Sequence, residues 1–214
     1  MQIVAIDVDE LANGTGVAPL TFLSKELLLQ KSRMTTDGKN TNGYPATTVM
    51  KPLLDNTIYP LISSNIKERI QRVNKTYYDS TTQSTLTSVE KLWIPSAREM
   101  FGGTSYESSG AIYTTIFKNN TTRIKNINGS AYNWWLRSAY YDSISRFYDV
   151  KPDGSIHYSG ADWIFGVCLG FCLGAEVETI TDDWATILAN TNPSASYSIG
   201  DTKSITINNE LHLM

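Results

Sequence analysis

The chain has 214 residues, of which 41% are hydrophobic and 18% charged, and its formal net charge is -3. These values provide a core for one domain and exclude a disordered acidic chain, a coiled coil and a basic nucleic-acid binder. No apolar run approaches the roughly 20 residues that span a bilayer, so we expect no membrane insertion. Residues 1–6 are too short, and lack the basic start, for a signal peptide.

Hydrophobic periodicity predicts mainly helices in the first half of the chain. The predicted elements are a strand at 1–8, helices at 20–32, 47–59 and 60–70, a strand at 72–78, a Ser/Thr-rich connection at 81–88 and a strand at 89–94. Pro52 has to lie near the first turn of its helix or kink it. Ser96 and Glu99 have the spacing of a capping box, which predicts a short helix that ends at residues 102–103.

The second half is predicted to be rich in short strands. Strands are expected at 132–137, 145–150, 155–158 and 165–173. Pro152, Asp153 and Gly154 form a strong hairpin turn between the middle two. The predicted fold class is therefore α+β, with helices packed on short antiparallel strands and long loops.

Few side chains of this sequence suit catalysis or metal binding. Cys168 and Cys172 are four residues apart, roughly 13 Å along a strand, which is too far for a disulfide and favours two small buried hydrophobic residues. His157 and His212 are the only imidazoles. We therefore expect no catalytic residues, no metal and no cofactor.

An acidic segment near the N-terminus has two interpretations. Asp7, Asp9 and Glu10 precede a Gly-rich stretch and resemble a loose calcium loop. The spacing misses the EF-hand pattern, so a strand end followed by a turn is the favoured interpretation.

Three stretches in a fixed order carry a family resemblance. They are WWLRSA at 134–139, FYDVKPDGSIHYSGAD at 147–162 and FGVCLGFCL at 165–173, and KLWIPSAREMFG at 91–102 adds a further match. This order resembles the C-type-lectin-like domains of gut bacteria and their phages, largely of unknown function, and is similar to variable proteins diversified by retroelements. The resemblance implies a C-type-lectin-like fold. It also implies that Trp134, Trp135 and Leu136 are core residues and that Arg137 is an inward, hydrogen-bonding scaffold residue.

The last 40 residues suggest a rearranged chain order. A short amphipathic helix is predicted at 182–189, followed by a turn at 200–201 and an alternating strand through Ile205 and Ile207. In the family such a segment precedes the strand that leads into the Gly-rich turn. We therefore expect a C-type-lectin-like core at 1–174 and a tail at 175–214 that completes it by circular permutation, with residues 204–214 beside 1–8. A second, truncated copy of the domain is the alternative.

The resemblance implies a presented surface between the WWLRS strand and the closing strand. The candidate ligand-binding residues are Tyr140, Tyr141, Asp142, Ser143, Ser145, Tyr148, His157, Tyr158, Ser159, Asp162 and Trp163, with Phe147 and Phe165 in the same segment. Tyr, Trp and Ser are the residue types that binding surfaces use. Alternation along the strand predicts that Phe147 points inward and Tyr148 outward.

These observations favour a ligand-displaying module of a phage receptor-binding or tail protein, or of a bacterial surface protein, and leave retroelement diversification open. The expected partner is a protein or glycan receptor on a host or target surface, with other virion proteins or tandem copies as further partners, and no nucleic acid. The expected location is the virion or the cell surface. The alternatives are an enzyme related to the formylglycine-generating fold and a structural spacer.

Overall fold

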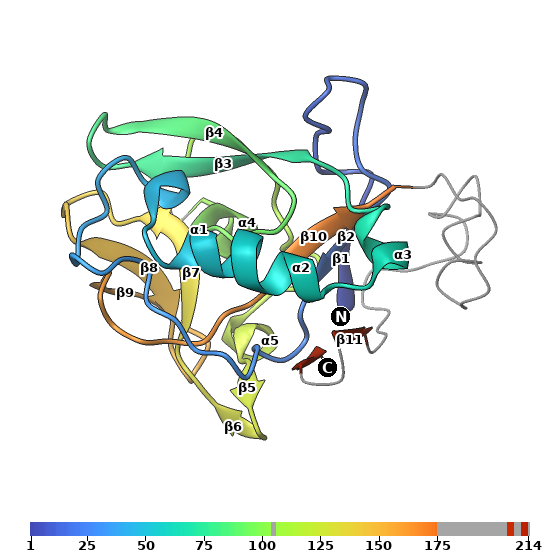
Figure 1. The fold of residues 1–214 in the computed structure, drawn as a ribbon. Helices are drawn as coiled ribbons and strands as arrows, with labels where there is room; N and C mark the ends of the chain where they lie inside the picture. The colour runs from blue at the N-terminus through green and yellow to red at the C-terminus, as the bar shows by residue number, and fades with distance from the viewer. Residues whose placement is uncertain (104–105, 175–204, 208–210, 214) are drawn as a thin grey trace.

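The computed structural model describes residues 1–103, 106–174, 205–207 and 211–213. It is a mixed α/β structure of small antiparallel sheets and short helices (Figure 1). The strands are β1 (Gln2–Ile6), β2 (Leu20–Leu23), β3 (Val73–Asp79), β4 (Ser84–Glu90), β5 (Asn126–Ile127), β6 (Ser130–Ala131), β7 (Trp134–Ala139), β8 (Arg146–Val150), β9 (Ile156–Gly160), β10 (Gly170–Leu173), β11 (Ile205–Ile207) and β12 (Leu211–Leu213). The helices are η1 (Tyr44–Ala46), α1 (Met50–Pro52), η2 (Leu53–Ile58), α2 (Tyr59–Leu61), α3 (Ser64–Lys67), α4 (Ala97–Phe101) and α5 (Asn120–Arg123).

The first sheet has the order β1-β2-β10, with all pairs antiparallel. It confirms the predicted strand within residues 1–8, whereas the helix predicted at 20–32 is wrong, because residues 20–23 form β2. β2 is the middle strand of this sheet, and all four of its residues are buried. A strand buried on both faces loses its alternation, so its apolar run can be taken for a helix.

The β3-β4 pair corrects two further predictions. The strand at 72–78 is confirmed as β3, but the predicted connection at 81–88 lies mostly in β4. The two strands pair from Asp79 and Ser84 to Val73 and Glu90. The strand predicted at 89–94 is also wrong, since β4 ends at Glu90 and Trp93 forms only an isolated bridge to Gly170.

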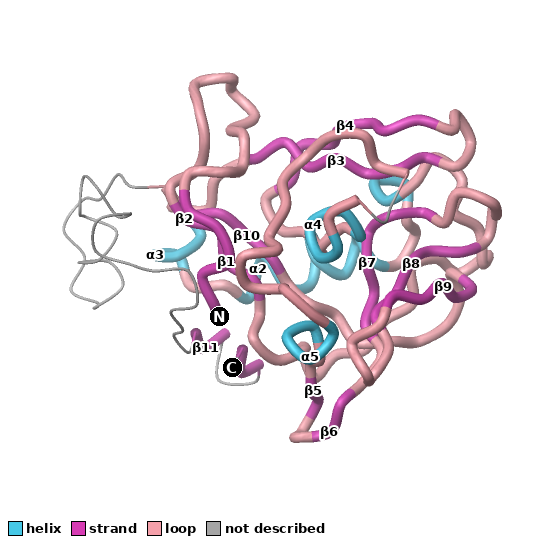
Figure 2. The backbone as a smooth tube through the Cα atoms, turned by 180° about the vertical axis from the view of Figure 1, so that it is seen from behind, coloured by secondary structure: helices cyan, strands magenta, loops and turns pink. Residues whose placement is uncertain are grey.

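The third sheet has the order β7-β8-β9 and confirms the predicted strands of the second half. Asp153 and Gly154 turn the chain between β8 and β9, and Gly154 has a φ of 79°. The closing strand is shorter than predicted, because β10 covers only residues 170–173. Figures 1 and 2 show this sheet and the β1-β2-β10 sheet on opposite sides of the molecule, with α4 between them.

The helix predicted at 47–59 is confirmed as one continuous helical segment from Met50 to Leu61, whereas the helix predicted at 60–70 is reduced to the end of this segment and α3. α1, η2 and α2 follow one another, and Pro52 lies in the first turn as expected. The predicted capping box is present: the Ser96 side chain accepts from the backbone N–H of Glu99, and Glu99 accepts from that of Ser96. The helix α5 and the β5-β6 hairpin were not predicted.

The core confirms the assignments made for the WWLRS strand. Trp134, Trp135 and Leu136 are fully buried, and Arg137 is buried with its guanidinium on Glu99. Cys168 and Cys172 are buried and unpaired, as expected.

The tail contributes the β11-β12 pair to the described structure. The helix predicted at 182–189 and the turn at 200–201 lie outside the described residues. Because β1 pairs with β2 and β11 with β12, the completion of residues 1–174 by residues 175–214 stays a prediction.

Candidate functional site

The loop between β7 and β8 is held from below by a buried asparagine. The Asn40 amide donates to the backbone carbonyls of Ser143 at 2.7 Å and Arg146 at 2.6 Å. Its backbone N–H donates to the carbonyl of Ile144 at 2.8 Å, and its side-chain oxygen accepts from Ser80 at 2.7 Å. These bonds fix residues 140–145 as an ordered loop above the sheet.

Aromatic side chains form a continuous row above this end of the β7-β8-β9 sheet. Tyr140 stacks on Tyr158 with 4.0 Å between ring centroids, and Tyr106 stacks on Tyr141 at 3.8 Å. Tyr140 and Tyr141 join the two stacks at 4.9 Å. We call this row the tyrosine surface, which comprises Tyr78, Tyr106, Tyr140, Tyr141, Tyr148, His157 and Tyr158.

The tyrosine surface is partly open to solvent. Tyr106 is 54% exposed, and Tyr141 and Tyr158 are each 37% exposed. A hydrogen bond with Tyr141 raises the pKa of Tyr106, so the Tyr106 hydroxyl stays protonated and able to donate at neutral pH. The surface therefore offers flat apolar faces edged with donors and acceptors.

Tyr148 lies beneath this row, so its predicted outward orientation is wrong. Its side chain is only 7% exposed and meets Tyr140 edge-on at 5.4 Å. Burial, followed by the neighbouring tyrosines, raises the pKa of Tyr148 well above its ordinary value. Tyr148 faces Tyr158 across β8 and β9, and the overlying Tyr140 covers it. Phe147 is buried, as predicted.

A shallow pocket of about 440 Å³ adjoins the tyrosine surface. It is lined by Arg146, His157, Tyr158, Ser159, Gly160 and Trp163. The Arg146 guanidinium lies 5.2 Å from the centre of the Tyr158 ring, and Trp163 is 57% exposed. Trp163 meets Phe165 edge-on, and Phe165 packs on the buried Trp135. The pocket thus combines a cation with two supported aromatic faces.

His157 is anchored by a buried carboxylate. Its Nδ1 lies 3.3 Å from Asp149 Oδ1, and Asn133 donates to the other oxygen of Asp149 at 3.2 Å. Burial raises the pKa of Asp149, against the hydrogen bonds from Asn133 and Ser159 that lower it. This contact fixes the ring of His157 parallel to Tyr158.

The structure brings together only part of the predicted set. Tyr140, Tyr141, His157, Tyr158 and Trp163 meet in the tyrosine surface and its pocket. Asp142, Ser143 and Ser145 lie on the adjoining loop, and exposed Asp162 lies beside Gly38 and Gly160. Ser159 is predicted as a surface residue but is buried, with its hydroxyl beside His157, and Phe165 is half-buried.

Three residues of the site escaped the sequence analysis. Arg146 could have been found, because alternation along β8 places it on the face of Tyr148. Tyr78 and Tyr106 come from a distant strand and a distant loop, and no local pattern links them to residues 140–158.

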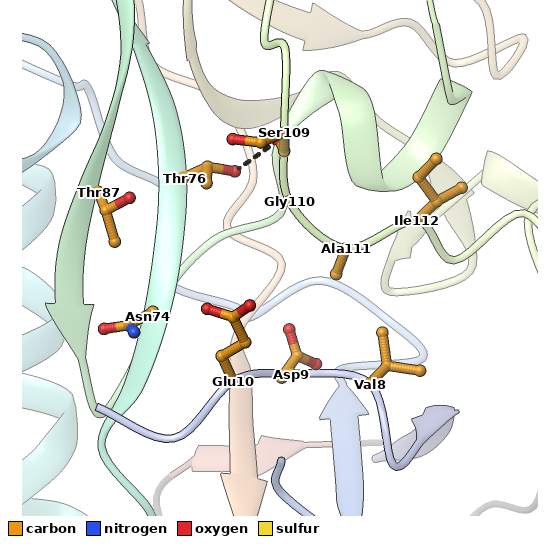
Figure 3. Close-up of a pocket in the computed structure, with 10 residues that line it drawn as sticks. All are labelled: Val8, Asp9, Glu10, Asn74, Thr76, Thr87, Ser109, Gly110, Ala111 and Ile112. Atoms are coloured by element: carbon orange, nitrogen blue, oxygen red, sulfur yellow. Dashed lines mark hydrogen bonds between the residues drawn. The ribbon is translucent and has the colours of Figure 1, made fainter. Parts of the chain in front are cut away.

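A second pocket, of about 550 Å³, lies between the segment after β1 and the β3-β4 pair (Figure 3). Its lining includes Asp9, Glu10, Asn74, Thr76 and Gly110. Asp9 is buried and ion-paired with Lys75 at 2.5 Å. The acidic segment is thus a strand end with a paired carboxylate, in agreement with the favoured interpretation.

Behind this pocket lies a buried network of charged side chains. Lys75 contacts Asp9, the Glu99 carboxylate at 3.1 Å and the Tyr113 hydroxyl at 2.7 Å. Burial alone raises the pKa of Glu99, but the charges of Arg137 and Lys75 lower it to about 2. Arg137 binds both Glu99 oxygens, at 2.7 and 2.8 Å, so Glu99 is the centre of this network.

Cys168 and Cys172 do not have the environment of reactive thiols. Both are buried, and burial raises the pKa of each above its ordinary value. Within the part of the chain that the structure describes, no group of three His, Cys, Asp or Glu side chains could hold a metal ion. The helices described there include none that is long and apolar enough to cross a membrane.

Comparison with known proteins gives a family and no characterised relative. No match is found among the curated proteins or among the solved structures. Residues 20–173 match a family described as a domain of unknown function, DUF6273. The match runs from β2 to β10 and includes the loop and strands of the tyrosine surface. The chain belongs to the DUF6273 family.

Proposed function

We propose that this chain is a ligand-displaying binding module whose tyrosine surface and adjoining pocket contact a protein or glycan receptor. The observation that carries the proposal is the unbroken row of ring contacts from Tyr106 through Tyr141 and Tyr140 to Tyr158, in which two stacked pairs are joined by a tilted contact. Exposed aromatic faces of this extent are uncommon on a surface that binds nothing. Because tyrosine gives a large contact area at small entropic cost, such a row suits recognition.

The order of the elements supports a C-type-lectin-like fold for this module. The WWLRS strand β7, its hairpin partners β8 and β9 and the closing strand β10 follow one another as in that family. β10 lies beside β2, which also pairs with β1, so the ends of the core segment meet in one sheet. The loops above β7-β9 are then free to present ligand-binding residues.

The setting we propose is a phage receptor-binding or tail protein, or a bacterial surface protein, exposed on the virion or the cell. The family resemblance supports this setting, and diversification of residues 140–163 by a retroelement would extend it. The alternative of an enzyme of the formylglycine-generating type needs accessible thiols, and burial of Cys168 and Cys172 argues for the binding module instead. A structural spacer would not need the exposed rings.

The test is attachment of the purified, fluorescently labelled chain to a panel of bacterial cells and of immobilised cell-surface glycans. The double variant Tyr141→Ala with Tyr158→Ala is expected to weaken attachment at least ~10-fold, since central aromatic contacts carry about 2 kcal/mol or more. Tyr59→Ala is the matched control, because Tyr59 is a half-buried tyrosine of α2 outside the tyrosine surface. Equal attachment by the double variant and the control would contradict the proposal.

A further inference from the structure

We infer that Lys75 and Asp9 condense into an intramolecular amide bond that joins β3 to the segment after β1. Lys75 Nζ lies 2.5 Å from Asp9 Oδ1, and both side chains are almost completely buried. Such a fixed pairing gives an amine and a carboxyl group an effective concentration of up to ~10⁸ M. The inference concerns a covalent modification and does not depend on the proposed function.

The carboxyl group of Asp9 is surrounded by donors that activate it for attack. The Tyr113 hydroxyl lies 2.9 Å from each Asp9 oxygen, and the Thr21 hydroxyl donates to Oδ2. Donors on a carboxyl oxygen stabilise the negative charge that develops when a nucleophile adds to the carbon. Thr21 and Tyr113 therefore occupy the positions that an acyl-transfer site requires.

The amine of Lys75 has a proton acceptor at hand. Glu99 Oε1 lies 3.1 Å from Lys75 Nζ and 3.2 Å from the Tyr113 hydroxyl. Arg137 and Lys75 hold the pKa of Glu99 low, so the group is a carboxylate that accepts a hydrogen bond from Lys75 and one from Tyr113. Glu99 thus links Lys75 to Tyr113, which contacts both oxygens of Asp9, and the proton that leaves Lys75 can pass along this path to Asp9.

The reaction balances without any further reagent. One proton passes from the ammonium of Lys75 to the carboxylate of Asp9, and the neutral amine then attacks the side-chain carbonyl carbon of Asp9. A carbon–nitrogen bond forms and a carbon–oxygen bond breaks. One oxygen of Asp9 leaves as water with two hydrogens from the former ammonium, and the amide product carries no charge.

The surroundings favour this product over the ion pair. Two charges held away from water are costly, and a neutral amide removes both. The Trp93 ring lies 4.0 Å from Lys75 Nζ and shields the amine. Asp9 also lines the solvent-accessible pocket of Figure 3, which offers the released water a way out.

The test is the intact mass of the full, folded chain. We expect a mass about 18 Da below that of the sequence, which is the loss of one water. Tryptic digestion should release a branched peptide in which residues 1–25 are joined to residues 73–91, since trypsin does not cleave after an acylated lysine. Fragmentation spectra should place the branch at Asp9 and Lys75.

Two variants distinguish a loss of water at Lys75 from a loss of water elsewhere in the chain. Lys75→Arg keeps the positive charge but has no amine that can form this amide, so its full mass is expected. Lys51→Arg is the matched control: Lys51 also contacts a buried carboxylate, Glu90, but is itself partly exposed and is expected to leave the loss of water unchanged. A folded wild-type chain with its full mass and no branched peptide would overturn the inference.

Discussion

Tyr140 stacks on Tyr158 across the top of β8, although the two residues belong to segments that flank this central strand on opposite sides. Tyr148 of β8 lies beneath and meets Tyr140 edge-on. The three rings therefore tie the loop after β7 to the hairpin, and the stack supports both the fold and the proposed binding surface.

Replacing Tyr158 should separate these two contributions. Tyr158→Ala removes the stacks with Tyr140 and His157 and is expected to lower the free energy of unfolding by about 1–2 kcal/mol. Tyr158→Phe keeps the ring and should stay within about 0.5 kcal/mol of the wild type. Urea denaturation measures both, and equal losses for the two variants would show that the ring stack contributes nothing.

Asn40→Ala should loosen the ordered loop. It removes the donor to the carbonyls of Ser143 and Arg146, and it leaves Ser80 without its acceptor. The expected cost is about 2–3 kcal/mol, together with faster hydrogen exchange of the loop amides of Tyr140 and Ser143, which donate to the carbonyls of Arg146 and Tyr140. Exchange of these two amides is the measured quantity. Thr36→Ala is the control, since the Thr36 hydroxyl makes only an exposed contact with Thr48. Unchanged exchange in Asn40→Ala would contradict the assigned role.

Glu99→Gln should be strongly destabilising. The substitution removes the carboxylate that binds the buried Arg137 guanidinium through both of its oxygens, and it leaves that cation with fewer partners. We expect a loss of about 3–5 kcal/mol, against less than about 1 kcal/mol for Asp55→Ala, whose pair with Lys51 is partly exposed. Thermal unfolding measures the stability of both variants. Similar losses of stability would show that the buried network stabilises the fold no more than a surface ion pair does.

The Glu99 carboxyl group should also make the stability of the folded chain depend on pH in the acidic range. The pKa of Glu99 is about 2 in the folded chain and lies near its ordinary value of 4.5 in the unfolded chain. Its contribution is therefore fully present above about pH 4.5 and is lost as the pH falls toward 2. The difference in stability between the wild type and Glu99→Gln should shrink across this interval, and a constant difference would contradict the assignment.

Glu107 should affect the pH dependence of stability in the opposite direction to Glu99. Burial, only partly offset by Arg137 and Ser138, raises its pKa in the folded chain. The folded state then holds a proton that the unfolded state releases, so stability should fall as the pH rises above the ordinary value of 4.5 toward the raised pKa. Glu107→Gln should flatten this part of the curve of melting temperature against pH. An unchanged slope would show that Glu107 does not bind the extra proton.

The sequence predicted the second half of the fold better than the first. β7, β8 and β9 are consecutive and joined by a turn with its own signature, so local patterns suffice to find them. β2 was missed because all four of its residues are buried, so they show no alternation, and because its partners, β1 and β10, lie at the two ends of the core segment. β4 was missed because its Ser and Thr residues resemble a loop, although they pair with β3 along its whole length.

In the candidate site, as in the fold, local groupings could be predicted from the sequence and long-range contacts could not. Tyr140, Tyr141 and Tyr158 lie in one local hairpin region and could be predicted together. The stack of Tyr106 on Tyr141 depends on the packing of a distant loop, and the burial of Tyr148 depends on the ring of Tyr140 above it. Long-range contacts of this kind leave no periodic signal in the sequence.

Tyrosine-specific chemical labelling in the presence and absence of bound bacterial cells tests the central claim most directly. It compares exposed tyrosines of the tyrosine surface with half-buried tyrosines elsewhere on the chain. If the surface is the binding site, labelling of Tyr106, Tyr141 and Tyr158 should fall at least ~10-fold on attachment, while Tyr59 and Tyr132 keep their reactivity. Protection of Tyr59 or Tyr132, with Tyr141 and Tyr158 still fully labelled, would contradict the account.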